Sequence, residues 1–272
     1  MRFDSGGALK TYFKTFTTGN EGTGVDDTAW TNTGWTDTDW HHIAMERYDG
    51  TITVYNNGTA LSTTSTVGTK WMFVDHEFNA YSTLGIGNGG NYNDSHWANG
   101  IIDEFRVTKG EARYQSNFTL PLAAFPAAAE NVLSVTDAHW AETVLLIQSD
   151  NQDTEGTFTD SSPSAYNHSI TANGGAVHST DTAKFGTSSI KLDGTDDYLS
   201  VPDSDDWNFG SESFTIEFWI NLQSWAPSHP TDHSAGLVTQ IADTNNGFWF
   251  VTDSTGAYDY TGLRTIKLFV RD

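Results

Sequence analysis

The chain has 272 residues, a formal net charge of −22 at pH 7 and no cysteine. The missing cysteines exclude disulfides and cysteine-ligated metal sites, and the negative charge argues against a nucleic-acid backbone as partner. The chain has no run of 18 apolar residues, so we expect no membrane insertion. Frequent glycines and short apolar runs between polar turns are typical of an all-β protein.

A β-hairpin is predicted over residues 40–58. Asp49-Gly50 forms a two-residue turn that tolerates positive φ at both positions, and a second turn follows at residues 56–58. Counting outward from the first turn places Arg47 opposite Ile52. The apolar side chains of the hairpin then share one face: Ile43, Met45, Ile52 and Val54.

Further strands are expected along the chain. Residues 101–107 form one, and the run 143–147 forms a buried one after a linker at residues 126–139 that begins with Pro126 and a run of Ala. Residues 214–220 alternate cleanly, so one face carries four apolar side chains and the other carries Thr215, Glu217 and Trp219. The inward set is Phe214, Ile216, Phe218 and Ile220.

Three segments together resemble laminin-G-like domains of the concanavalin A-like lectin and glucanase superfamily. They are the hairpin beginning Trp-His-His-Ile-Ala at residue 40, the strand Gly-Ile-Ile-Asp-Glu-Phe-Arg-Val at residues 100–107, and Ala-Arg-Tyr followed by Asn-Phe-Thr-Leu-Pro within residues 112–121. The last is similar to the tail of such repeats in bacteriophage structural proteins. The resemblance implies an antiparallel jelly-roll β-sandwich and a place in a virion.

The segments occur in the reverse of the family order. Residues 1–125 resemble the C-terminal half of a laminin-G domain, and residues 140–272 resemble the N-terminal half. Two accounts remain open: a circularly permuted sandwich, or a window across tandem repeats completed by a neighbouring chain. Both predict that the two segments pair into common sheets, because either alone leaves an open edge.

Catalysis is not expected. Glycosidases of the superfamily place carboxylates at alternate strand positions, whereas Asp103 and Glu104 are adjacent and are expected to point to opposite faces. His41 and His42 are also neighbours, and we interpret them as framework residues.

Clustered aspartates occupy three loops. Asp150 and Asp153 lie in the first, Asp193, Asp196 and Asp197 in the second, and Asp203 and Asp205 in the third. Calcium prefers several hard oxygen ligands, so Asp150, Asp153, Asp203 and Asp205 are candidate Ca²⁺ ligands. The alternative is that these side chains cap turns.

Tryptophans are unusually frequent, with ten in the chain. Trp97 with Tyr92, then Trp30 and Trp35, lie in loops rich in Gly and Asn, Thr or Asp, where an exposed indole can stack on the face of a sugar ring. These four residues are the candidate carbohydrate-binding side chains; the alternative is packing onto the sandwich or between subunits.

The expected function is a non-enzymatic structural or attachment module of a virion, such as a tail-fibre, tail-associated or capsid-decoration protein. Its partners would be other virion proteins, copies of itself as a homo-oligomer, and host cell-surface glycans. It would be made in the host cytoplasm and reside in the virion. The alternative is a secreted or cell-surface lectin or adhesin, and a glycoside hydrolase is disfavoured.

Overall fold

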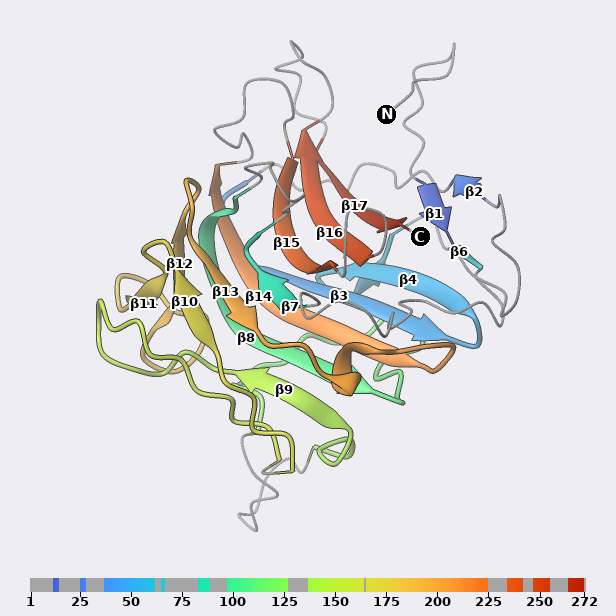
Figure 1. The fold of residues 1–272 in the computed structure, drawn as a ribbon, viewed down its shortest axis with the longest axis horizontal. Helices are drawn as coiled ribbons and strands as arrows, with labels where there is room; N and C mark the ends of the chain where they lie inside the picture. Colours follow the sequence, from blue (N-terminus) through green and yellow to red (C-terminus); the bar gives the residue numbers. More distant parts are fainter. Residues whose placement is uncertain are drawn as a thin grey trace.

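The computed structural model describes residues 12–14, 25–27, 37–61, 65–66, 83–88, 97–126, 137–163, 165–224, 234–241, 247–254 and 264–271. Two antiparallel sheets pack face to face as a β-sandwich of jelly-roll type, which confirms the predicted fold class (Figure 1). A short 3-10 helix, η1 (Asp205–Trp207), interrupts one connection. Within the described ranges, no helix has the length and apolar character needed to span a bilayer.

The larger sheet has nine strands. Its order is β11 (Val177–Ser179), β12 (Ser189–Asp193), β8 (Asn99–Lys109), β14 (Phe214–Ser224), β3 (His41–Tyr48), β4 (Thr51–Asn56) and β5 (Thr59–Ala60). Two further strands join it, β6 (Ser65–Thr66) beside β4 and β9 (Thr143–Ile147) beside β8.

The smaller sheet has six strands. Its order is β10 (Thr171–Asn173), β13 (Tyr198–Val201), β7 (Thr83–Ile86), β15 (Ser234–Ile241), β16 (Gly247–Ser254) and β17 (Arg264–Arg271). A separate two-stranded sheet consists of β1 (Tyr12–Lys14) and β2 (Val25–Asp27).

Both large sheets mix strands from the two segments of the chain. In Figure 1 the orange β14 lies between the green β8 and the blue β3, and it pairs with both along most of its length. In the other sheet, β7 lies between β13 and β15. The two segments therefore share both sheets within one chain, which is the pairing predicted from their reversed order.

The hairpin forms in the predicted register. Arg47 pairs with Ile52 and Met45 with Val54. Asp49 and Gly50 have φ values of 44° and 71°, so the turn adopts the left-handed conformation that its sequence favours. The four predicted core side chains of this hairpin are fully buried.

The main hydrophobic core lies between the sheets. The inward face of β14 contributes all four side chains predicted for it, and Phe218 contacts Phe250 of β16 edge to face with ring centroids 6.4 Å apart. Leu84, Ile86 and Leu199 belong to the same core cluster. Burial of such side chains stabilises each by about 1.5–3 kcal/mol relative to exposure.

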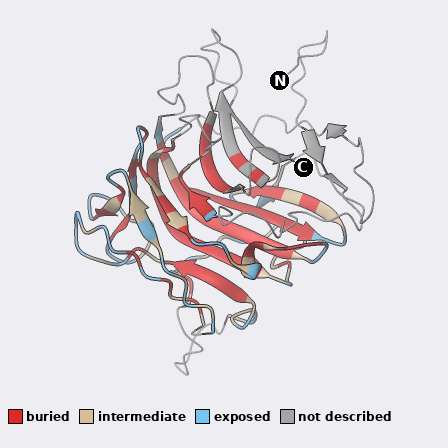
Figure 2. Ribbon diagram, in the orientation of Figure 1, coloured by how far each residue is buried: buried red, intermediate tan, exposed pale blue. Residues whose placement is uncertain are grey.

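The outer face of the larger sheet is also buried. Figure 2 shows β3, β8 and β14 buried almost continuously, and Thr215, Glu217 and Trp219 are 0–2% exposed. The residues that follow β8, 111–126, lie over this face, and we call them the covering segment. A second polar layer is therefore enclosed behind the main core.

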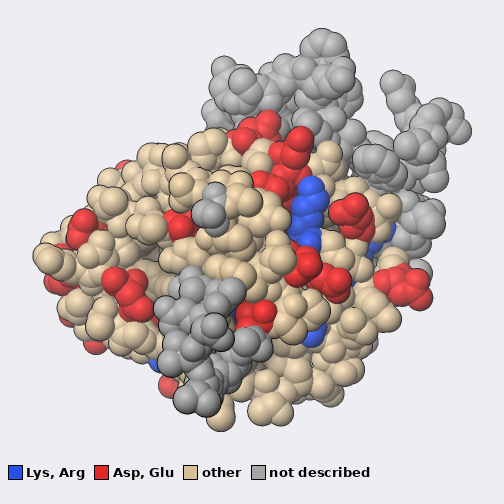
Figure 3. Space-filling model, turned by 90° about the horizontal axis from the view of Figure 1, so that it is seen from below, with Lys and Arg blue, Asp and Glu red and all other residues tan. Residues whose placement is uncertain are grey.

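Acidic side chains are spread over the surface. On the face shown in Figure 3 they form small scattered groups, and the basic side chains occupy a smaller area among them. This distribution agrees with the strongly negative formal charge of the chain.

Candidate functional site

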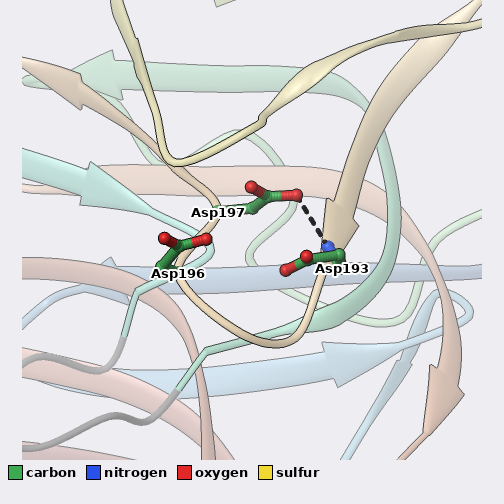
Figure 4. A group of neighbouring side chains, drawn as sticks. All are labelled: Asp193, Asp196 and Asp197. Atoms are coloured by element: carbon green, nitrogen blue, oxygen red, sulfur yellow. Dashed lines mark hydrogen bonds between the residues drawn. The ribbon is translucent and has the colours of Figure 1, made fainter.

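The turn between β12 and β13 gathers three carboxylates. Asp193, Asp196 and Asp197 come from one short loop, and one carboxylate oxygen of each lies within 4.8 Å of the others (Figure 4). The loop is tight because Gly194 has φ 80° and a Cβ there would lie 2.6 Å from Cβ of Asn99. In the described ranges this is the one such group of three or more acidic or histidine side chains.

Hydrogen bonds within the loop already use the most buried of these carboxylates. Asp197 is 4% exposed, and its two oxygens accept from the backbone N–H groups of Gly175 and of Asp193, the latter at 2.9 Å. Oδ1 of Asp193 accepts from the N–H of Thr195 at 2.7 Å. Burial raises the pKa of Asp197, the two backbone bonds lower it, and the charges of Asp193 and Asp196 raise it further.

The hydrogen bonds of the loop decide how well it could bind a cation. Asp193 and Asp196 are exposed and could offer hard oxygen ligands to a cation. Calcium takes six to eight oxygens, however, and both oxygens of Asp197 accept backbone hydrogen bonds. The residues fit turn closure better than a preformed calcium cage.

Two aromatic rings stand beside this loop. Trp97 and Tyr198 stack with ring centroids 5.4 Å apart and an interplanar angle of 27°, and both are half-buried. Tyr198 follows Asp197 directly, while Trp97 lies two residues before Asn99, whose Cα partner is Asp193. The stack and the acidic loop are therefore close in the chain and across the β12–β8 pairing, and we call this region the Trp97–Tyr198 edge.

The other predicted carbohydrate-binding residues cannot be placed with Trp97. Tyr92, Trp30 and Trp35 lie outside the described residues. Tyr198 was not among the predicted residues, because its sequence context indicates a strand rather than a loop.

The four predicted calcium ligands lie on two separate connections. Asp150 accepts from the N–H of Thr187 at 2.6 Å, and Asp153 accepts from that of Thr180 at 3.1 Å, so both fasten neighbouring turns. Asp203 is exposed after β13, and Asp205 begins η1. None of the four belongs to the group at the β12–β13 turn.

A network of charges fills the outer face of the larger sheet. Glu217 is fully buried and accepts from Nε and Nη2 of Arg106 at 2.8 and 2.6 Å. Asp137 accepts from Nη1 of Arg106 at 2.9 Å and from Nη1 of Arg113 at 2.8 Å. These four residues form the outer charge network, which contains two positive and two negative groups.

Two further side chains complete the hydrogen bonding of Glu217. His42 Nε2 lies 3.2 Å from Oε2, and the hydroxyl of Tyr114 donates to the same oxygen. Burial alone would raise the pKa of Glu217, but the charge of Arg106, with smaller contributions from His42 and Arg113, holds it well below its usual range.

The covering segment is fastened through its backbone. Glu46 of β3 accepts from the N–H groups of Tyr114 and Gln115, each at 2.7 Å. Burial raises the pKa of Glu46, and these bonds oppose the shift. Glu46 directly, and Glu217 through Tyr114, are therefore engaged in holding the covering segment, and both are closed off from solvent.

The expectation that Asp103 and Glu104 point to opposite faces is wrong. The pairing of β14 with β8 shifts register between Glu217 and Trp219, and Glu104 has φ 52°, so an extra residue forms a β-bulge there. Both carboxylates bind groups that cover the outer face: Asp103 accepts from the N–H of Phe185, and Glu104 from that of Phe125. Strand alternation does not hold across a bulge.

Two histidines of the hairpin serve the framework as interpreted from the sequence. His41 begins β3, with Nδ1 2.9 Å from Asn56 Oδ1 and Nε2 2.9 Å from Asp37 Oδ1. His42 packs against Trp219 with ring centroids 5.1 Å apart.

A buried serine–histidine pair closes a turn after β9. Ser149 Oγ lies 2.7 Å from His178 Nδ1, and His178 Nε2 lies 2.9 Å from the carbonyl of Thr157. Both side chains are at most 5% exposed, and Phe158 stacks on the imidazole. Because both ring nitrogens are engaged, the pair links neighbouring turns and does not present a nucleophile to solvent.

The chain matches no known family model, and no curated protein or solved structure is significantly similar to it.

Proposed function

We propose that this chain is a non-enzymatic attachment and structural module of a virion, and that its lectin-like sandwich contacts host glycans at the Trp97–Tyr198 edge. One observation carries the glycan contact: two half-buried aromatic rings stack, and one of them follows directly on a turn that carries two exposed carboxylates. Flat aromatic surfaces stack on the apolar faces of sugar rings, and carboxylates accept hydrogen bonds from their hydroxyls.

The burial of the carboxylates supports a binding module over a hydrolase. The carboxylates on the outer sheet face are buried and already bound to backbone N–H groups or to Arg106: Glu46, Asp103, Glu104 and Glu217. A glycosidase needs two carboxyl groups on either side of a bound sugar. The virion setting rests on the resemblance of residues 112–121 to the tails of bacteriophage laminin-G-like repeats.

The test is glycan binding by wild type and by Trp97→Ala. By analogy with the stacking of bases on aromatic side chains, loss of the indole should weaken binding by about 1–3 kcal/mol, or roughly 5- to 150-fold in Kd. The matched control is Tyr48→Ala, because Tyr48 is a 47% exposed aromatic at the β3–β4 turn, on a connection remote in sequence. Binding is measured by glycan array and then by titration with the best glycan.

Thermal unfolding of both variants distinguishes a loss of stability from a loss of glycan binding. We expect Trp97→Ala to melt close to wild type. Glycan arrays that remain blank for the wild-type protein, at the highest concentration tested, would contradict the glycan contact. A native mass equal to one chain would favour the free lectin over the virion module, which should assemble with copies of itself.

A further inference from the structure

Two adjacent carboxyl groups are enclosed in the outer layer of the larger sheet. Asp103 and Glu104 are both 0% exposed, and the β-bulge directs both toward the groups that cover this face. Within the described part of the chain, the hydrogen bonds to Asp103 come from backbone N–H groups, those of Glu104, Lys184 and Phe185 at 2.8–3.1 Å. Glu104 accepts one, from Phe125 at 2.7 Å.

The two carboxyl groups differ in how well they tolerate a negative charge. Three donors point at Asp103, which favours its ionised form. Among the described residues, Glu104 has a single donor on Oε2, and its buried Oε1 has no hydrogen-bond partner there. An uncompensated buried charge is far more costly than an uncompensated neutral oxygen, so Glu104 is the better place for a proton.

The charged groups around the pair do not neutralise it. Asp150, which caps the turn at residues 184–187 through Thr187, adds a third negative charge that acts on both carboxyls. The charge of Arg106 acts on Glu104 in the opposite direction, but its guanidinium is bound to Glu217 and Asp137. The ammonium of Lys184 lies over the Trp219 ring, 3.8 Å from its centroid.

Each carboxyl holds a different covering element against the sheet. Asp103 binds the turn at residues 184–187. Glu104 binds the end of the covering segment at Phe125, whose ring also contacts the Arg106 guanidinium at 3.7 Å. A change in the charge of the pair therefore acts on both covers at once.

We propose that Asp103 and Glu104 form a proton-binding latch. The latch holds the covering segment and the 184–187 turn on the sheet while the carboxyl pair is protonated, and it loosens both elements when both carboxyls ionise. The pKa values of both carboxyl groups are raised, as this proposal requires. Burial raises the pKa of Asp103 to about 7 against the effect of its backbone hydrogen bonds. Burial, and then the charges of Asp103 and Asp150, raise that of Glu104 to about 8 against its bond from Phe125.

The sign of the stability change follows from linkage. An unfolded aspartate or glutamate releases its proton near pH 4, whereas the folded latch keeps it until pH 7–8. Stability from the latch is therefore complete below about pH 4 and is lost as the pH rises through 7 and 8. Between these limits each retained proton changes the folding equilibrium constant by about tenfold per pH unit.

The test measures the unfolding equilibrium by urea between pH 5.5 and 9 for wild type, Glu104→Gln and the control Glu212→Gln, which makes the same change at an exposed position. We expect the logarithm of the wild-type folding equilibrium constant to fall as the pH rises. For Glu104→Gln, the slope of this logarithm against pH should be smaller by one proton, because the variant lacks one titrating carboxyl. For Glu212→Gln, the slope should equal that of wild type. Equal slopes for wild type and Glu104→Gln would overturn the proposal.

A second measurement keeps the proposal testable if Glu104→Gln does not fold. In wild type labelled with ¹³C at its carboxyl groups, the Glu104 resonance should titrate above pH 7, and amide exchange at Phe125 should lose protection over the same range. A Glu104 resonance that titrates below pH 5 would refute the latch without bearing on the glycan contact at the Trp97–Tyr198 edge.

Discussion

The outer charge network makes a quantitative prediction about Glu217. Replacing it by Leu removes one of two negative charges and leaves the Arg106 guanidinium, 6% exposed, with Asp137 as its remaining charged partner. Asp137 also neutralises Arg113, so the variant buries a net charge of one. Removing one partner of a buried pair typically costs about 3–5 kcal/mol, and we expect that loss in the free energy of unfolding.

The matched double variant separates charge balance from packing. Arg106→Met combined with Glu217→Leu leaves the Arg113–Asp137 pair neutral and keeps similar volumes. Well-packed apolar replacements of a whole buried pair are often nearly neutral. We therefore expect the double variant to be at least as stable as either single one, with an interaction energy of about 3 kcal/mol in the double-mutant cycle.

The assay is urea unfolding at pH 7, analysed as a two-state transition. Single variants whose losses add within about 0.5 kcal/mol would refute the reasoning, because independent sites add and coupled ones do not. A loss below about 1 kcal/mol for Glu217→Leu would have the same consequence, since it would mean that water reaches the network.

Two further predictions concern the backbone. A Cβ at Gly58 would lie 2.2 Å from the carbonyl oxygen of Phe118, so Gly58→Ala should destabilise by well over the roughly 1 kcal/mol cost of its positive φ alone. Gly110→Ala is the control, since Gly110 has φ 86° with no atom within 4 Å of its Cβ position, and equal melting temperatures of the two variants would contradict the clash. Residues 1–126 expressed alone lack β14, the strand that lies between β3 and β8 and pairs with both. This fragment should show no cooperative thermal transition by circular dichroism. A sharp transition would contradict the sharing of the sheets between the two segments.

The part of the fold that could be predicted from the sequence is the part decided by local chemistry. Asp49-Gly50 specifies a turn conformation, and the register of the hairpin follows from it. The alternation in residues 214–220 identified the inward face correctly. It could not show that the other face is covered, because the cover lies about 100 residues earlier in the chain, beginning near Glu111.

The candidate site was predictable only in part. Trp97 stands out because its loop is polar, whereas Tyr198 becomes recognisable only when the two rings are brought together. The bulge at Glu104 could not be predicted, because a non-glycine residue with positive φ carries no signal in its own identity. A useful signal was nevertheless present: Glu217 is the one charged residue of the largely apolar strand β14, and such a residue is seldom buried without a partner.

The position of β14 between β3 and β8 has a consequence for how the protein is made. β8 ends at Lys109 and β14 begins at Phe214, about 100 residues later. At about 5–20 residues per second, a ribosome needs roughly 5–20 s to add the strand that joins these two edges. During that interval the emerged chain exposes one unpaired edge of β3 and one of β8, with the carboxylates and guanidinium groups that will later be enclosed. Assembly of the sandwich must therefore wait for the last quarter of the chain, and protection from premature pairing with other chains depends in that period on the charges themselves.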